Sequence, residues 1–182
     1  MDKDPLAERS DDQLMASVGA GDRLAFHELV RRHHRTAWGV ALRFAGHDDD
    51  AEDLVQDTFL TVFQKAASYR SQGRFSSYLL CILANRSISG HRKQRPILVA
   101  SLPEPTGGPE GESSLVQAQA SARIAALLAE LPERQRMAIV LRYYQELSHA
   151  EIAETMEISQ KAVERLLHRA RLTLRDKLDR RA

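Results

Sequence analysis

Residues 147–175, LSHAEIAETMEISQKAVERLLHRARLTLR, decide the fold of the C-terminal part of this chain. Ser148 followed three residues later by Glu151 forms a capping box, which marks the start of a helix. Ser159 can cap a second helix after a short turn. We therefore predict a helix-turn-helix at residues 148–171, a motif whose second helix enters the major groove of duplex DNA.

The outward side chains of the second helix are of the kinds that read base edges. Arginine pairs with guanine, glutamine with adenine, and glutamate accepts a hydrogen bond from cytosine. The candidate DNA-binding residues are Ser159, Gln160, Lys161, Glu164, Arg165, His168, Arg169 and Arg171. The alternative is a generic amphipathic hairpin with a solvated basic face.

Basic and acidic residues are unevenly distributed, although the formal net charge is only +1. From Lys161 to the C-terminus, eight basic residues stand against three acidic ones. A second basic group contains Arg86, Arg92, Lys93 and Arg95, and residues 48–57 are strongly acidic. Two basic patches and one acidic patch predict two polyanion contacts and one basic protein partner.

Helical periodicity runs through most of the chain, and no segment of useful length alternates with period 2. An apolar fraction of 43% with only 5% aromatic residues favours helical bundles. We predict an all-α fold. We expect a first helix capped by Asp11 or Asp12 and a second capped by Asp22. Further helices are expected to begin at Asp48–Asp50, at about Phe75 (running to Lys93), at Leu115 (running to Leu131) and at Pro132, followed by the helix-turn-helix.

Two helices have well-defined apolar faces in the sequence. The second helix is expected to bury Leu24, Phe26, Leu29, Val30, Ala37, Val40, Ala41 and Phe44, with Trp38 beside them. The third is expected to bury Leu54, Val55, Thr58, Phe59, Val62 and Phe63.

Residues 96–114 contain four prolines and three glycines, which cannot support a long helix. We interpret this segment as a flexible linker between two small helical domains, residues 11–95 and 115–182, preceded by a tail at 1–10. An ordered surface loop within one domain is the alternative.

The third expected helix has a dense acidic start. Its first-turn carboxylates complement the helix dipole, but this effect does not explain Asp53, Gln56 and Asp57 further along. A polar ridge beside an apolar face is typical of a docking surface for a basic helix.

The fourth expected helix and the loop before it mix aromatic side chains with cations. Aromatic rings that stack on bases and cations that contact phosphates form a plausible single-strand surface. The candidates are Tyr69, Arg70, Arg74, Tyr78, Asn85, Arg86, Arg92 and Lys93. Alternatively, the apolar residues of this helix are core and the cations are solvated, and both interpretations can hold on opposite faces.

Several kinds of site are excluded. The single cysteine, Cys81, allows no intramolecular disulfide and no thiolate zinc site, and we expect a buried, unreactive thiol. The histidines have no metal-ligand spacing, and no catalytic or phosphate-binding motif occurs. We expect no metal, no cofactor and no enzymatic activity. No secretory signal or membrane span appears, so we expect a cytoplasmic protein.

Three segments in this order carry a family resemblance: DAEDLVQDTFLTVF (50–63), FSSYLLCILANRSISGHRK (75–93) and LPERQRMAIVLRYYQELSHAEIAETMEISQKAVERLLHRAR (131–171). With the linker between the last two, the chain resembles the extracytoplasmic-function (group IV) sigma factors of the sigma-70 family. The resemblance covers residues 11–95, as region 2, and 115–180, as region 4.

The resemblance implies an alternative sigma factor that brings core RNA polymerase to promoters. Asp53, Gln56 and Asp57 would then face the clamp coiled coil of the β′ subunit. The loop 69–74 and the helix around Asn85 would bind the −10 element, with one base flipped out of the stack.

The same resemblance assigns the reading of the −35 element to Glu164, Arg165, His168 and Arg169. It also implies contact with the β flap and control by an anti-sigma factor. Three departures are visible. Tyr78 stands where the family usually has tryptophan, and Gly90 lies inside the expected −10 helix, at a cost of roughly 1 kcal/mol relative to alanine. Glu164 and Arg165 differ from many relatives, so the −35 sequence cannot be copied from any of them.

Two other functions remain open from the sequence. One is a one-component helix-turn-helix regulator with an N-terminal sensing or dimerisation bundle, which predicts a dimer on a palindromic operator. The more distant one is an enzyme or scaffold with an incidental helical hairpin. A sigma factor instead predicts a monomer that binds core polymerase tightly and promoter duplex alone weakly.

Overall fold

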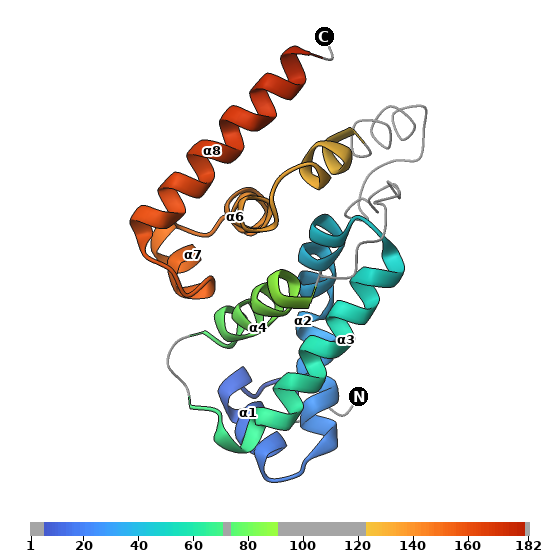
Figure 1. Ribbon diagram of the computed structural model, residues 1–182. Helices are drawn as coiled ribbons and strands as arrows, with labels where there is room; N and C mark the ends of the chain where they lie inside the picture. Colours follow the sequence, from blue (N-terminus) through green and yellow to red (C-terminus); the bar gives the residue numbers. More distant parts are fainter. Residues whose placement is uncertain (1–5, 71–73, 91–122, 181–182) are drawn as a thin grey trace.

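The computed structural model describes residues 6–70, 74–90 and 123–180, and every regular element in them is helical (Figure 1). The predicted all-α fold is therefore confirmed. The elements are α1 (Asp11–Gly19), α2 (Arg23–Ala45), α3 (Asp48–Lys65), the 3₁₀ turn η1 (Ala66–Ser68), α4 (Phe75–Gly90), a short helix at 123–129, α6 (Glu133–Tyr143), α7 (His149–Thr155) and α8 (Gln160–Asp179). The expected linker at 96–114 lies outside the described residues, as do Arg92 and Lys93.

Helices α1 to α4 form a bundle in which α2 packs along α3 and both contact α4 (Figure 1). The interior is built from aliphatic side chains and a few aromatic ones, as the low aromatic content predicts. Its fully buried large side chains are Leu14, Met15, Leu29, Val40, Leu42, Phe44, Val62, Leu79 and Leu83.

The helix starts follow the capping residues, with one correction. Ser10, and not Asp11 or Asp12, caps α1: its backbone is extended, its Oγ accepts from the amide of Gln13 at 3.3 Å, and Gln13 Oε1 accepts from its amide at 2.8 Å. This reciprocal pair satisfies two amides that an aspartate within the first turn would leave open. Asp22 caps α2 as predicted.

Two residues of the predicted apolar faces are exposed. Leu24 is 70% exposed because it lies about 100° around α2 from the buried Ala25. Phe63 is 39% exposed at the edge of the buried face of α3, where its ring meets that of Phe26 with centroids 5.0 Å apart. The rest of the third helix's predicted face is buried or partly buried.

The segment before α1 packs on α2 through one arginine. The guanidinium of Arg32 donates to the carbonyl oxygens of Leu6, Ala7 and Arg9 at 2.7–2.9 Å. It also pairs with Asp11 at 3.0 Å. Residues 6–9 of the expected tail are therefore held on the bundle.

Arg32 and Arg31 both bind the buried carboxylate of Glu28. The three Nε or Nη to Oε distances are 2.6–2.8 Å. These hydrogen bonds lower the pKa of Glu28 from 4.5 to about 2, although burial opposes the shift. The carboxylate is thus stabilised in its charged form by the fold.

Glu28→Gln is expected to lower the free energy of unfolding at neutral pH by about 2 kcal/mol, because it removes the charge that two arginines share in a buried position. The pKa is lower in the folded state, so the stabilisation is complete above pH 4.5 and is lost as the pH falls towards 2. Urea denaturation of both proteins across this range measures the difference. It should shrink with acidity, whereas exposed Glu164→Gln should stay within about 0.5 kcal/mol of wild type throughout.

The C-terminal domain packs α6 and α7 against α8. Its buried side chains include Met137, Leu141, Ile152, Val163 and Leu167. This domain lies directly on the first bundle, with α6 against α2 and α7 against α4 (Figure 1). Across residues 6–70, 74–90 and 123–180, no helix combines the length and apolar character needed to cross a bilayer.

Candidate nucleic-acid interfaces

The predicted capping box begins α7. Ser148 Oγ accepts from the amide of Glu151 at 3.2 Å, and Glu151 Oε2 accepts from the amide of Ser148 at 2.8 Å. The hydrogen bond from the Ser148 backbone is also the main reason that the pKa of Glu151 is lowered. Ser159 caps α8 by accepting from the amide of Ala162 at 3.2 Å. The two predicted helix starts are therefore confirmed, whereas the second helix runs to Asp179, beyond the predicted end at residue 171.

The turn between α7 and α8 has a left-handed residue. Glu157 has φ of 53°, and the next amide, that of Ile158, donates to the carbonyl of Ala153 at 2.9 Å. A positive φ at a residue other than glycine is uncommon and costs free energy. This conformation lets the chain turn within residues 156–159 and start the second helix at Gln160.

Helix α8 separates its packing side from an exposed side. Val163, Leu167 and Ala170 are buried. The exposed side carries the predicted reading residues Gln160, Lys161, Glu164, Arg165, His168 and Arg169, which we call the reading face. Ser159 precedes it and has its hydroxyl occupied by the cap.

Arg134 of α6 was not among the residues that the sequence predicted to bind DNA. It lines a hollow of about 260 Å³ together with Arg165 and Arg169 of the reading face. Three guanidinium groups around one hollow increase the positive charge beside α8. The pair Arg134 and Arg136 in the sequence was the available signal, but only the crossing of α6 and α8 decides which of the two faces outward.

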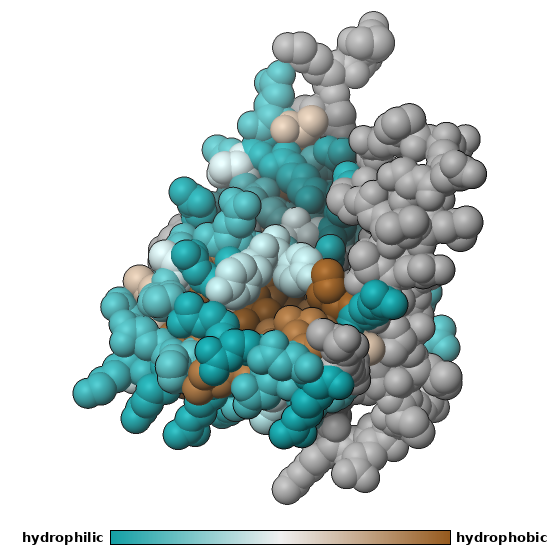
Figure 2. Space-filling view, turned by 90° about the horizontal axis from the view of Figure 1, so that it is seen from above, coloured by the Kyte–Doolittle hydropathy of each residue, from teal (hydrophilic) through white to brown (hydrophobic). Residues whose placement is uncertain are grey.

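Arg171, predicted to bind DNA, lies at a second hollow. Its Nε donates to the carbonyl of Leu167 at 3.3 Å, and it borders an apolar groove of about 490 Å³. Figure 2, which views the molecule from the side of the α8 C-terminus, shows hydrophobic side chains gathered among hydrophilic ones. The groove is lined by Ile124, Leu127, Leu128, Ile139, Tyr143, Tyr144, Arg171, Leu174, Arg175, Leu178 and Asp179.

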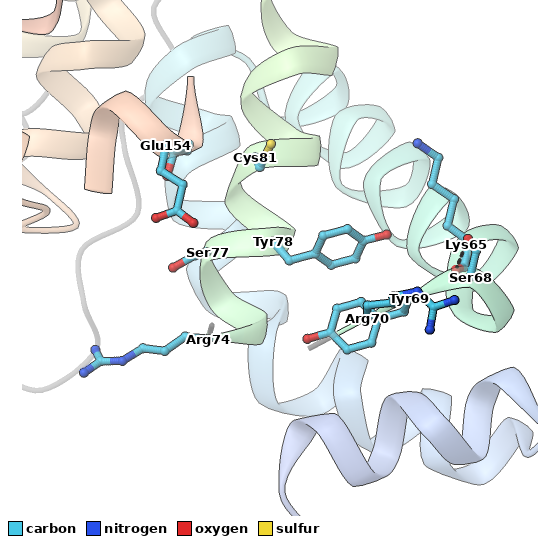
Figure 3. Close-up of a pocket in the computed structure, with 10 residues that line it drawn as sticks. Lys65, Ser68, Tyr69, Arg70, Arg74, Ser77, Tyr78, Cys81 and Glu154 are labelled. Carbon is cyan, nitrogen blue, oxygen red and sulfur yellow. Dashed lines mark hydrogen bonds between the residues drawn. The ribbon is translucent and has the colours of Figure 1, made fainter. Parts of the chain in front are cut away.

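The second candidate surface is a hollow of about 570 Å³ between the two domains (Figure 3), which we call the interdomain hollow. From the first domain it takes Lys65, Ser68, Tyr69, Arg70, Arg74, Ser77, Tyr78 and Cys81, and from α7 it takes Glu154 and Thr155. Four of the predicted −10 residues are thus brought together.

The two tyrosines of the hollow also belong to the packing of the bundle. Tyr69 and Tyr78 have ring centroids 5.0 Å apart, and both contact Phe75. The hydroxyl of Tyr69 donates to Asp12 Oδ1 at 2.7 Å, and burial raises the pKa of both phenols. Each ring is therefore partly core and partly surface, and binding of a single strand by these residues stays a prediction.

Asn85 and Arg86 point to different neighbours. Asn85 Nδ2 donates to Glu157 Oε1 at 3.3 Å, across the domain boundary. Arg86 donates to Asp57 Oδ2 at 2.9 Å and to Thr61 Oγ1 at 2.8 Å. One predicted −10 residue is thus paired with a predicted polymerase-docking residue.

The other docking candidates lie nearby on α3. Asp53 and Gln56 are exposed, and Gln56 Nε2 donates to Glu52 Oε1 at 3.2 Å. The side chain of Asp57 is 60% exposed despite its pair with Arg86. The acidic ridge expected from the sequence is therefore open to a partner.

Cys81 is only partly buried, contrary to the expectation, because it faces the interdomain hollow (Figure 3). Its Sγ donates to Glu157 Oε1 at 3.5 Å. Burial, reinforced by Glu157, raises the pKa of this thiol to about 11. The thiol is therefore protonated at neutral pH and weakly nucleophilic.

Comparisons with known proteins agree with this two-part arrangement. Residues 29–97 match the family model described as Sigma-70 region 2, and residues 121–174 match Sigma-70, region 4. The chain is 32% identical over 167 residues to the ECF RNA polymerase sigma factor SigM of Mycobacterium tuberculosis, covering 92% of this chain and 84% of SigM. It is 30% identical over 175 residues to SigW of Bacillus subtilis, covering 88% and 92%.

The ECF RNA polymerase sigma factor SigE of Mycolicibacterium smegmatis is 34% identical over 166 residues and matches 87% of this chain. The chain spans 64% of the length of SigE. Among solved structures, CnrH in complex with the cytosolic domain of CnrY matches with a TM-score of 0.71 and 28% identity, over 96% of this chain and 100% of CnrH.

RpoE of Bartonella quintana, solved with the anti-sigma factor NepR, has the same fold with a TM-score of 0.62 at 22% identity, over 85% of this chain and 96% of RpoE. The helix-turn-helix, the acidic ridge of α3 and the relatives over nearly the whole chain agree. The chain belongs to the extracytoplasmic-function sigma factors of the sigma-70 family.

Proposed function

We propose that this chain is a promoter-specificity subunit that directs core RNA polymerase in the cytoplasm and has no catalytic activity of its own. The observation that carries the proposal is the reading face of α8, six exposed polar or charged side chains on a helix whose other side is buried. In the proposal, α8 enters the major groove of the −35 element, and Arg165 and Arg169 contact base edges.

The interdomain hollow supports binding of the −10 strand by the first domain. Tyr69 and Tyr78 offer ring surfaces, and Arg70 and Arg74 offer cations. Asn85 lies outside the lining of the hollow, one turn along α4 from Cys81, and offers an amide for a base edge. Stacking on aromatic rings contributes about 1–3 kcal/mol per base. Binding of the unpaired strand would supply the free energy for opening the duplex, so the proposal requires no nucleotide hydrolysis.

Two further surfaces support docking on polymerase. The exposed ridge of Asp53, Gln56 and Asp57 complements a basic helix, and we assign it to the clamp of the β′ subunit. The apolar groove beside α8 has the size and character to take an amphipathic helix, and we assign it to the β flap.

We also propose that an anti-sigma factor controls this chain. CnrH, which matches 96% of the chain, was solved in complex with the cytosolic domain of CnrY. A protein that covers the apolar groove or holds the two domains together would block docking on polymerase.

The proposal is tested by mixing the purified chain with bacterial core RNA polymerase. We expect co-purification with core and run-off transcripts from promoters that the holoenzyme selects out of random DNA. A stable dimer that binds a palindrome without polymerase would instead support the one-component regulator, which no relative named above supports.

Asp57→Lys is expected to weaken binding to core polymerase by at least about tenfold, because charge reversal places a cation against a basic partner. Fluorescence anisotropy of the labelled chain titrated with core measures the effect. Asp49→Lys is the matched control, since Asp49 is exposed on the same helix but precedes the ridge. Equal affinities of both variants would show that the ridge is not the docking surface.

A further inference from the structure

The two domains are joined by contacts at two separate places. At the first, Arg136 of α6 donates to the carbonyl of Phe44, at the end of α2, with a distance of 2.6 Å. Its guanidinium carbon also lies 5.3 Å from the centroid of the Phe44 ring. Arg43 lies 4.2 Å from the centroid of the Tyr144 ring and adds a second cation–π contact.

The second place is the carboxylate of Glu157 in the turn of the helix-turn-helix. Glu157 Oε1 accepts from Asn85 Nδ2 at 3.3 Å and from Cys81 Sγ at 3.5 Å. Both donors are on α4. Close by, Glu154 and Thr155 close one side of the interdomain hollow (Figure 3).

The backbone at Glu157 adds an independent observation. Its φ of 53° is a conformation that glycine adopts without strain. Helix-turn-helix turns often contain glycine. Glutamate at this position strains the backbone, but its side chain is long enough to reach the first domain.

We propose that Glu157 makes the free chain self-inhibited: its carboxylate occupies the amide of Asn85, and α7 closes one side of the hollow that binds the −10 strand. This inference rests on the proposed function, which assigns Asn85 and the hollow to that strand. Glu154 lines this hollow, and Glu157 is hydrogen-bonded to Cys81, which also lines it, so both carboxylates would repel the phosphates of a strand bound there.

The contacts mask only one of the two DNA surfaces. The reading face of α8 is exposed while α7 lies on α4. The closed chain would therefore retain contact with a −35 duplex and lose contact with the unpaired −10 strand. Separation of α6 and α7 from the first domain would restore the second contact.

A reversible cross-link tests the closure directly. Cys81 is the only native cysteine and lines the interdomain hollow together with Glu154 of α7, so Glu154→Cys creates a single pair across the boundary and leaves the Glu157 carboxylate in place. At alkaline pH, where the Cys81 thiolate is populated, a short bis-methanethiosulfonate linker should join the pair within the free full-length chain. With core polymerase and its selected promoter, the linked protein should give no run-off transcript, and reduction of the linker should restore it.

The control for this lock is Glu154→Cys combined with Cys81→Ser, which cannot be linked. Failure to cross-link in the free chain, or equal transcription before and after reduction, would overturn the inference. Absence of transcripts from the wild-type chain would contradict the proposed function instead, while the cross-linking yield would still decide whether the chain closes.

Glu157→Gly tests the masking without a linker. The free variant should bind a fluorescent single strand carrying the selected −10 sequence roughly fivefold more tightly than wild type, the factor that about 1 kcal/mol represents. Glu146→Gly is the matched control: Glu146 also has a positive φ, 54°, and is exposed. Equal gains in the two variants would attribute the effect to backbone strain and overturn the inference.

Discussion

Arg136→Met is expected to lower the free energy of unfolding by about 3 kcal/mol, because hydrogen bonds from a charged donor contribute roughly 1.5–3 kcal/mol and their carbonyl partners would stay buried. Arg136 is only 5% exposed. Its guanidinium donates to the carbonyls of Phe44, Ala129 and Leu131 at 2.6, 2.6 and 3.2 Å. Methionine keeps much of the aliphatic stem and removes all of the donors.

Urea denaturation followed by circular dichroism measures this loss. Arg142→Met is the control, since Arg142 lies on the same helix, is exposed and has one hydrogen bond, to the carbonyl of Leu147 at 2.9 Å. The control should lose less than about 1 kcal/mol. Equal losses in the two variants would show that burial of the three carbonyls contributes little.

Arg169→Ala is expected to reduce discrimination between the selected −35 sequence and a scrambled one by roughly fivefold to 150-fold. This range follows from about 1–3 kcal/mol for a bidentate contact between arginine and a base. The reason is geometric: Arg169 is exposed on the same side of α8 as Arg165, and the two border one hollow. Competition binding of holoenzyme to both promoters measures the ratio.

Arg134→Ala is the informative control for that measurement. Arg134 borders the same hollow but belongs to α6, outside the reading helix, so we expect it to contact a phosphate. Loss of this side chain should weaken binding to both promoters equally and lower the salt dependence of binding by about one charge. If Arg169→Ala behaves in the same way, α8 does not read bases at that position.

The local signals in the sequence were sufficient for most of the fold. Ser148, Ser159 and Asp22 cap the helices that they were predicted to cap, because a cap depends on residues within one turn. The exception, Ser10, competed with two neighbouring aspartates that are equally good caps. Capping propensity alone could not show which of these three adjacent residues caps α1.

The relation between the domains could not be predicted in this way. The pairs Arg136 with Phe44 and Asn85 with Glu157 join residues 92 and 72 positions apart. No periodicity or spacing connects residues so distant in sequence. The pairing of Arg86 with Asp57 was missed for the same reason, since each residue was assigned to a separate surface.

The burial of Arg136 could not be predicted from the sequence either. Arg134 and Arg136 are two positions apart on α6, and only one of them faces outward. Which one does so is decided by where α6 crosses α2 and α8.

The acceptors of Arg136 are all backbone carbonyls, and this determines which substitutions the contact between the domains can tolerate. A main-chain oxygen is present whatever side chain stands at position 44, 129 or 131, so substitutions there leave the acceptors in place. The guanidinium is different, because lysine lacks its planar fork of donors. Exchange of the first domain for that of a relative should therefore preserve this junction, provided that the last turn of α2 keeps its backbone course.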